Sequence, residues 1–153
     1  EGKAAPAFTL PDQNGNKVSL KDFKGKNLVL YFYPKDSTPG CTREGQGFRD
    51  NYAKFRRQNC IVLGVSRDSI KSHENFKARQ EFPFELLSDG DETVCRLFDV
   101  IREKNMYGKK SMGIQRSTFL IDADGKVQKV WKRVQVAGHD EQVLEAAREL
   151  LGK

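Results

Sequence analysis

Cysteine and histidine are scarce in this chain, and neither residue type is spaced as a set of metal ligands. Three cysteines occur in 153 residues, and no CxxC pair is among them. An odd number of widely separated cysteines argues against a disulfide framework and suits a reducing compartment. The two histidines, His73 and His139, are each isolated in the sequence. We therefore expect no metal and no other cofactor, and no histidine acting as a base.

Long apolar runs are also missing. No run approaches the length of a membrane span, and no leader with a charged and then an apolar part precedes the first predicted strand. We therefore expect a cytoplasmic protein without a membrane partner. Repeats, low-complexity tracts and linkers are absent too, and the composition, 37% hydrophobic and 31% charged, is that of a globular protein. The prediction is a single domain over residues 1–153.

Acidic residues are outnumbered, but not by an organised basic patch. There are 27 Lys and Arg against 21 Asp and Glu, which gives a net charge of +6. The basic clusters are small, such as Arg56-Arg57 and Lys132-Arg133, and no RNA-recognition or helix-turn-helix pattern contains them. We interpret this excess as a solvated surface that attracts anionic substrates or an acidic reductant, and we expect no nucleic-acid partner.

The chain is organised around the stretch LVLYFYPKDSTPGCTRE, residues 28–44. Leu28 to Tyr33 is a short apolar run rich in aromatic residues, which predicts a strand buried on both faces. Pro34 ends that strand, and the turn-forming residues up to Gly40 predict a tight loop followed by a helix that begins near Cys41. A thiol would then lie where unpaired N–H groups favour a negative sulfur. The alternative is a small buried hydrophobe, which the polar, glycine-rich neighbourhood disfavours.

The remaining patterns predict an α/β fold. Parallel βαβ units come first and an antiparallel hairpin comes last, so we expect a mixed central sheet flanked by helices, with an N-terminal hairpin extension. Glycines 45 and 47 weaken the start of the helix after the tight loop, because glycine costs roughly 1 kcal/mol in a helix. The segment Ile101 to Ile114 is expected to be irregular, with Met106 and Tyr107 exposed as a partner surface, a lid or plain packing. The predicted elements are a hairpin of Ala7–Leu10 and Lys17–Leu20, a helix from Cys41 through Phe55, a strand at Cys60–Ser66, a helix at Ile70–Glu81, a strand at Phe84–Leu87, a helix at Asp91–Val100, strands at Ser117–Ile121 and Val127–Val134, and a C-terminal helix capped by Asp140.

Several motifs resemble one enzyme family. Pro34, Thr38 and Cys41, spaced as in YFYPKDSTPGCT, resemble the active-site motif of the peroxiredoxins. The blocks GVSRDS, LLSD and RSTFLID, which begin at residues 64, 86 and 116, resemble the bacterioferritin comigratory protein or peroxiredoxin Q branch. The resemblance covers nearly the whole chain. It implies a thioredoxin-like fold and a thiol peroxidase that reduces hydrogen peroxide and organic hydroperoxides in antioxidant defence.

The resemblance also implies a role for each matching residue. Cys41 would be the nucleophile that becomes a sulfenic acid, with Thr38 orienting the peroxide and Pro34 shielding the sulfur. Arg116 would stabilise the thiolate and the leaving oxygen, although composition alone allows an ordinary surface cation. Glu44 either forms a hydrogen bond in the site or only suits the start of a helix, and the two interpretations are equally favoured.

The chain departs from the family pattern at the second thiol. The two usual positions of a resolving cysteine hold Gln46 and Lys77. Cys60 begins a strand expected to run parallel to the Leu28 strand, so it would lie roughly 20 Å from Cys41, too far for a disulfide. Cys95 falls at the border of an apolar helix face and could be partly accessible. A structural role for it is favoured, with resolution after local unfolding as the minority interpretation.

We therefore expect a one-cysteine cycle in a monomer, with an external reductant such as thioredoxin, glutaredoxin or a low-molecular-weight thiol. Two other classes of function compete with the peroxidase. A thiol–disulfide oxidoreductase is disfavoured by the missing CxxC motif. A non-enzymatic basic binding module would be expected if Cys41 were unreactive.

Overall fold

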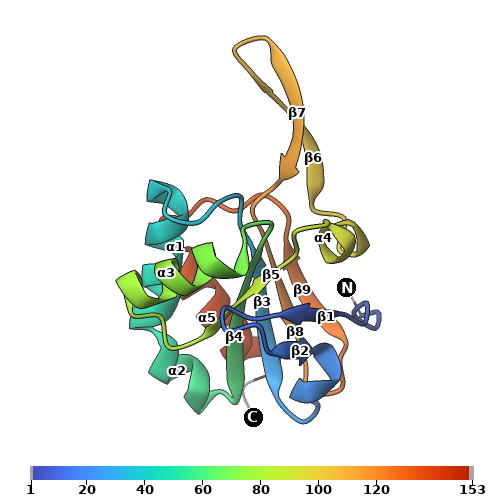
Figure 1. Cartoon of the computed structure of the whole chain (residues 1–153). Coiled ribbons are helices and arrows are strands. Elements are labelled where there is room, and N and C mark those ends of the chain that lie inside the picture. Colours follow the sequence, from blue (N-terminus) through green and yellow to red (C-terminus); the bar gives the residue numbers. More distant parts are fainter. Residues whose placement is uncertain (1, 152–153) are drawn as a thin grey trace.

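The computed structural model describes residues 2–151, apart from the side chain of Met106. Its centre is a five-stranded sheet in the order β5-β4-β3-β8-β9 (Figure 1). β3, β4 and β5 are parallel, whereas β8 runs antiparallel to β3, and β9 antiparallel to β8. The mixed sheet and the α/β class are thus confirmed. The strands are β3 (Asn27–Phe32), β4 (Cys60–Ser66), β5 (Glu85–Ser88), β8 (Ser117–Ile121) and β9 (Val127–Trp131).

β3 is buried along its whole length because both faces of the sheet are covered. Leu28, Leu30 and Phe32 belong to one apolar cluster, while Val29 and Tyr31 belong to a second cluster on the other face. The second cluster is covered by the helices α1 (Pro39–Asp50), α2 (Tyr52–Arg57), α3 (Ile70–Gln80) and α5 (His139–Leu151). The first is covered by the predicted N-terminal hairpin and two short helices, β1 (Thr9–Pro11), β2 (Lys17–Ser19), the 3₁₀ helix η1 (Leu20–Phe23) and α4 (Thr93–Leu97).

Two predicted helices are interrupted. The helix expected from Cys41 through Phe55 begins earlier, at Pro39, because proline fits a first helical turn. It breaks at Asn51, which leaves the helical region with ψ 7°. The helix expected at residues 91–100 shrinks to α4, because Glu92 and Asp99 on its two sides adopt left-handed φ values of 65° and 58°. Within residues 2–151, no helix has the length and apolar character needed to cross a bilayer.

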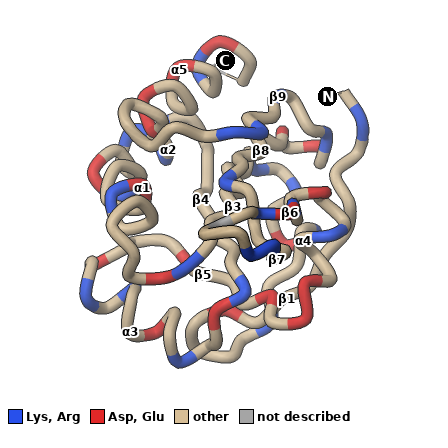
Figure 2. The backbone as a smooth tube through the Cα atoms, turned by 90° about the horizontal axis from the view of Figure 1, so that it is seen from above, with Lys and Arg blue, Asp and Glu red and all other residues tan. Residues whose placement is uncertain are grey.

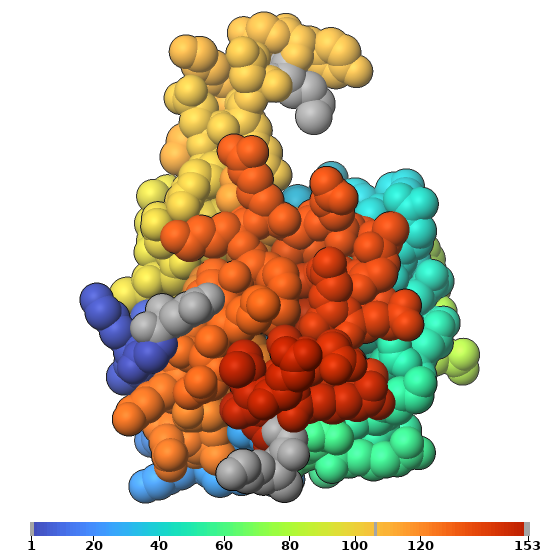
Figure 3. Space-filling model, turned by 180° about the vertical axis from the view of Figure 1, so that it is seen from behind, coloured from blue at the N-terminus to red at the C-terminus, as the bar shows by residue number. Residues whose placement is uncertain are grey.

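The prediction of an irregular segment at residues 101–114 is wrong. The segment forms an antiparallel hairpin of β6 (Ile101–Met106) and β7 (Lys109–Ile114), which stands away from the body of the molecule (Figures 1 and 3). Tyr107 and Gly108 make the turn, both with positive φ, as a two-residue hairpin requires. No Asn-Gly or Asp-Gly pair marks this turn, and few of the side chains are buried, so the sequence shows no alternation. Tyr107 is 98% exposed, and the predicted exposure of Met106 lies outside the described part of the structure.

The glycines near the start of α1 have a packing function. A Cβ at Gly45 would overlap the ring of Phe82, and one at Gly47 would lie 2.8 Å from Cγ of Asp140 in α5. Close contact with neighbouring elements therefore requires glycine at both positions. The weakened helix start that the same two glycines predict stays a prediction.

Candidate active site

Cys41 is the third residue of α1 and follows the carboxyl end of β3. Its exposed fraction is only 2%, and it packs in the apolar cluster that contains Val29, Tyr31 and Phe48. These surroundings are more apolar than the sequence predicts, because the polar residues next to Cys41 in the chain are not all its neighbours in space. A thiol at this position is shielded from bulk water, yet it lies in the first turn of a helix, where backbone N–H groups lack helical acceptors.

Thr38 is the residue that begins α1, but its side chain does not cap the helix. Its hydroxyl instead donates a hydrogen bond of 2.8 Å to the carbonyl oxygen of Lys35, which leaves the oxygen lone pairs of Thr38 able to accept. The first backbone hydrogen bond of the helix joins Thr42 N–H to Thr38 carbonyl, at 2.8 Å. The N–H groups of Gly40 and Cys41 precede it. Pro34, half-buried, is the second residue of the loop between β3 and α1.

Arg116 is not an ordinary surface cation. It precedes β8, its side chain is 17% exposed, and its Nη1 donates to Oε1 of Glu44 at 2.6 Å. Its Nη2 lies against the backbone of Gly40, where a Cβ would be 3.1 Å away. Burial lowers the pKa of Arg116, but the charges of Glu44 and Cys41 and hydrogen bonds to both outweigh it, so the pKa lies above its ordinary value. A permanently charged guanidinium therefore adjoins Glu44 and Cys41.

Glu44 forms a hydrogen bond within the site, the first of the two interpretations that the sequence allows. Its side chain is 1% exposed and pairs with Arg116. Burial raises the pKa of Glu44 to about 7, although the charge and hydrogen bond of Arg116 act in the opposite direction. Among the described residues, Oε2 of Glu44 and the hydroxyl of Tyr31 are buried without a hydrogen-bond partner. Burial and then the charges of Glu44 and Cys41 raise the pKa of Tyr31, so its hydroxyl keeps its proton.

The Glu44 carboxyl makes the stability of the protein depend on pH. Its pKa is about 7 in the folded protein against an ordinary value of 4.5, so between these values the folded state holds the proton more tightly than the unfolded state. The free energy of unfolding should therefore fall as pH rises through this window, by up to about 3 kcal/mol from this group. Urea unfolding at about pH 5 and about pH 8 should show a smaller difference in Glu44→Gln than in the wild type. Equal differences in the two proteins would contradict this assignment.

The hairpin adds a cation, Lys104, that no motif in the sequence indicates. Lys104 of β6 and Arg67 both lie against Gly113, where a Cβ would be 3.3 Å from Cδ of Lys104 and 3.7 Å from Nη2 of Arg67. Burial lowers the pKa of Lys104, as do the charges of Arg116 and Arg67, while the charge of Cys41 raises it. These couplings put Lys104 within electrostatic reach of the site, and Figure 2 shows basic residues on the hairpin above the sheet. Because the sequence predicts an irregular segment here, it gives no strand register, and without a register the direction of Lys104 cannot be predicted.

Cys60 occupies the position that the sequence predicts. It pairs with Asn27, at the end of β3 remote from Cys41. Its side chain is fully buried, and burial raises the pKa of its thiol to about 11. A buried, protonated thiol at the far end of the sheet has a structural role.

Cys95 does not have the partial access that the helix pattern suggests. Its exposed fraction is 0%, and it packs in the apolar cluster on the face of the sheet opposite to Cys41. Its N–H donates to Asp89 Oδ2 at 2.7 Å. Burial, followed by the hydrogen bond and charge of Asp89, raises the pKa of its thiol well above the ordinary value. Val94, Cys95 and Phe98 are buried whereas Leu97 is 51% exposed, so Cys95 lies on the apolar face of this segment and not at its border.

His73 and His139, isolated in the sequence, are both buried and hydrogen-bonded. Nδ1 of His73 lies 2.7 Å from Oδ2 of Asp36, and Nε2 lies 2.9 Å from the carbonyl oxygen of Leu87. Asp36, Asp68 and His73 present ligand atoms within 4.8 Å of one another, a grouping in space that the isolation of His73 in the sequence does not indicate. The carboxylates already accept hydrogen bonds from protein donors, which accounts for the cluster without an ion. His139 pairs with the Thr118 hydroxyl at 2.8 Å.

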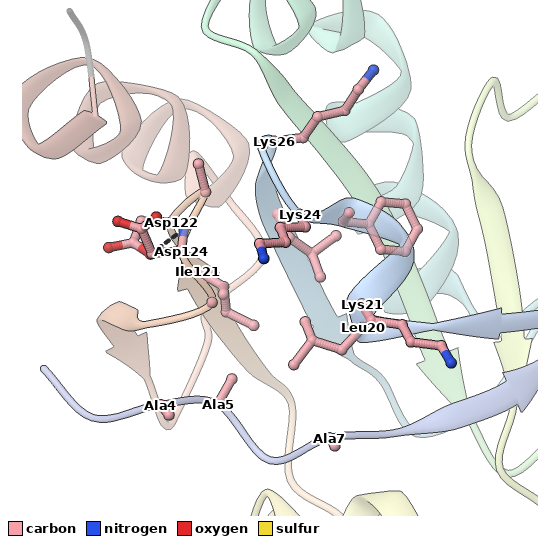
Figure 4. Close-up of a pocket in the computed structure, with 14 residues that line it drawn as sticks. Ala4, Ala5, Ala7, Leu20, Lys21, Lys24, Lys26, Ile121, Asp122 and Asp124 are labelled. Atoms are coloured by element: carbon pink, nitrogen blue, oxygen red, sulfur yellow. Dashed lines mark hydrogen bonds between the residues drawn. The ribbon is translucent and has the colours of Figure 1, made fainter.

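A pocket of about 280 Å³ lies far from Cys41 (Figure 4). Its walls come from the N-terminal segment, η1 and the turn after β8, and include Leu20, Leu28 and Ile121. Leu28 is near the amino end of β3, whereas Cys41 follows the carboxyl end. This pocket is therefore not part of the candidate active site.

The fold and the site together define a thiol peroxidase of thioredoxin-like fold, with one shielded cysteine at a helix start beside an arginine–glutamate pair. The model of the AhpC/TSA family matches residues 2–130, and the chain belongs to that family. It is 53% identical to a peroxiredoxin Bcp of Xanthomonas campestris, over 94% of this chain and 91% of that one. A putative peroxiredoxin bcp of Coxiella burnetii is 51% identical over 94% and 95%. A solved structure of the Xanthomonas campestris bacterioferritin comigratory protein superimposes with a TM-score of 0.90 at 51% identity, covering 94% of this chain and 92% of that one.

Proposed function

We propose that this peroxidase reduces both hydrogen peroxide and organic hydroperoxides at Cys41. The observation that carries this proposal is the charged guanidinium of Arg116 beside a cysteine in the first turn of α1. The Xanthomonas campestris relative was studied for alkyl peroxide reduction, which supports organic hydroperoxides as substrates here. The test is the rate at which the protein consumes hydrogen peroxide, tert-butyl hydroperoxide and cumene hydroperoxide, each measured with a thiol reductant present.

In the first step, the Cys41 thiolate attacks one oxygen of the peroxide. The S–O bond forms as the O–O bond breaks, so the sulfur is oxidised to a sulfenic acid and the peroxide is reduced by two electrons. The departing oxygen takes up a proton and leaves as water or an alcohol. Arg116 stabilises the charge that develops on that oxygen, Thr38 accepts a hydrogen bond from the bound peroxide, and Pro34 limits access of water.

We propose that an external thiol completes the cycle. That thiol attacks the sulfenic acid to give a mixed disulfide and water, and a second thiol releases Cys41 as the reductant becomes a disulfide. Gln46 and Lys77 at the usual resolving positions support this, as does the burial of Cys95 on the opposite face of the sheet. Thioredoxin, glutaredoxin or a low-molecular-weight thiol would supply the electrons. The reducing cytoplasm is the proposed setting, and the monomer the proposed form.

One equivalent of peroxide should leave a sulfenic acid on Cys41 and two unmodified thiols. Dimedone trapping followed by peptide mass spectrometry should find the adduct on the Cys41 peptide, in the wild type and in Cys95→Ala alike. Burial keeps Cys60 and Cys95 protonated and inaccessible, which is why they should not react. An internal disulfide between Cys41 and Cys95, lost in Cys95→Ala, would refute the one-cysteine cycle.

A further inference from the structure

Cys41 cannot meet a protein thiol in the arrangement that the structure shows. Its exposed fraction is 2%, whereas a mixed disulfide needs the two sulfurs about 2.05 Å apart. The same enclosure suits a small peroxide. The stretch that must move to admit a larger thiol is the loop between β3 and α1, residues 33–38, together with the first turn of the helix. What holds this loop closed therefore decides which of the two reactions the sulfur can undergo.

Asp36 holds the loop through four hydrogen bonds, three to residues outside the loop and one to Tyr33 at its start. Its Oδ1 accepts from the Tyr33 hydroxyl at 2.6 Å, and its Oδ2 accepts from the Ser72 hydroxyl at 2.8 Å. His73 Nδ1 lies 2.7 Å from the same Oδ2. The backbone N–H of Asp36 donates to Oδ2 of Asp68 at 2.9 Å, which ties the loop to the end of β4.

His73 is the partner that joins Asp36 to the sheet as well as to α3. Its Nδ1 faces a carboxylate that already accepts two hydroxyl hydrogens, and its Nε2 faces the Leu87 carbonyl of β5 at 2.9 Å. Nε2 faces a carbonyl oxygen and must therefore donate, while one hydrogen bond joins Nδ1 to Oδ2 of Asp36. The side chains of His73 and Asp36 are 0% and 2% exposed. A buried pair with hydrogen-bond partners at both ring nitrogens and both carboxyl oxygens therefore connects the loop to α3 and β5.

The backbone next to Asp36 has a left-handed conformation that the contacts of Asp36 would help to hold. Ser37, the residue between Asp36 and Thr38, has a left-handed φ of 63°. A residue other than glycine keeps such a conformation only where its surroundings impose it. Release of Asp36 would relax Ser37 and shift Thr38, the residue at which α1 begins.

We propose that the Asp36–His73 pair is the positioning element of the active-site loop: it keeps Cys41 in the closed form that reacts with peroxide, and it separates when a protein thiol reaches the sulfur. His73 touches neither substrate nor sulfur and acts through Asp36, Ser37 and Thr38. The inference rests on the proposed reaction of Cys41, but the opening of the loop can be measured without peroxide.

His73→Gln tests the proposal, because the glutamine amide cannot bridge Asp36 and the Leu87 carbonyl as the two ring nitrogens do. We expect the second-order rate constant for hydrogen peroxide to fall about tenfold and the rate at which an aromatic disulfide modifies Cys41 in the reduced protein to rise about tenfold. A role confined to overall stability would leave both rates unchanged at temperatures where the protein is folded. The opposite direction of the two changes is therefore specific to positioning.

Two further variants keep the test decisive. Tyr33→Phe removes a single donor to Asp36 without changing the buried ring, so it should shift both rates in the same directions by a smaller factor even if His73→Gln does not fold. His139→Gln is the matched control, since His139 is a buried histidine that hydrogen-bonds Thr118 and Gln142 and not the loop. It should leave the ratio of the two rates unchanged. The proposal would be overturned if the ratio of the peroxide rate to the modification rate were unchanged in both Tyr33→Phe and folded His73→Gln. An equal change of this ratio in His139→Gln would overturn it too. A wild-type protein that does not react with peroxide would refute only the proposed function.

Discussion

Replacing the Cys41 sulfur by oxygen should abolish peroxide consumption while the protein stays folded. Cys41→Ser removes the only thiol in the first turn of α1, and a serine hydroxyl is almost entirely protonated and a poor nucleophile toward an O–O bond. The substitution is small, and the buried hydroxyl has first-turn N–H groups nearby. Stopped-flow or coupled assays should give the uncatalysed rate, and circular dichroism should match the wild type.

The other two thiols provide the controls for this prediction. Cys60→Ala and Cys95→Ala each remove a fully buried sulfur remote from Cys41, so they should lower stability by about 1 kcal/mol or more and retain peroxide turnover. If Cys41→Ser turned over peroxide at the wild-type rate with a thiol reductant, the peroxidase mechanism assigned to Cys41 would fail. Loss of turnover in Cys60→Ala would instead indicate that the buried thiols take part.

The central strands could be predicted closely because short apolar runs in the sequence indicate strands that are buried on both faces. β3 and β4 are apolar at successive positions because both faces of the sheet are covered. The predicted ends of β4, Cys60 and Ser66, are those observed. The hairpin of β6 and β7 has no such pattern, since most of its side chains face solvent. It is held by backbone pairing and by a turn with two positive φ values. Tyrosine rarely adopts a positive φ, so Tyr107 does not indicate a turn at this position.

In the candidate active site, too, the features that depend on local sequence could be predicted, and the contacts between distant residues could not. The loop, the thiol and the helix start are consecutive in the chain, so their relation follows from local structure. The contact between Arg116 and Glu44 joins residues 72 positions apart, and only the resemblance of RSTFLID to a known motif pointed to that arginine. His73 and Asp36 are separated by 37 positions, and although Asp36 lies within the motif YFYPKDSTPGCT, nothing in the sequence pairs it with His73. Contacts of this kind depend on the packing of α3 over the sheet, which no periodicity in the sequence specifies.

Removing the positive charge at Arg116 should slow the reaction with peroxide by about two to three orders of magnitude, the usual effect of losing a donor aimed at a developing negative charge. Arg116→Met keeps much of the side-chain volume but leaves Glu44 buried without its partner. The pKa of Glu44 should then rise above about 7, because the one influence that lowers it is gone. Initial rates of peroxide consumption and the pH dependence of unfolding measure the two effects separately.

The comparison with two milder variants decides whether Arg116 acts through geometry or through charge alone. Arg116→Lys keeps the charge but loses the fork that reaches Glu44 and the backbone of Gly40 together, so it should recover only part of the rate. Lys104→Gln removes a cation that is coupled to Cys41 but makes no hydrogen bond with Glu44, and it should slow the reaction far less than Arg116→Met. If Lys104→Gln and Arg116→Met were equally slow, the rate would depend on net positive charge around the sulfur, and the specific role of the arginine would be refuted.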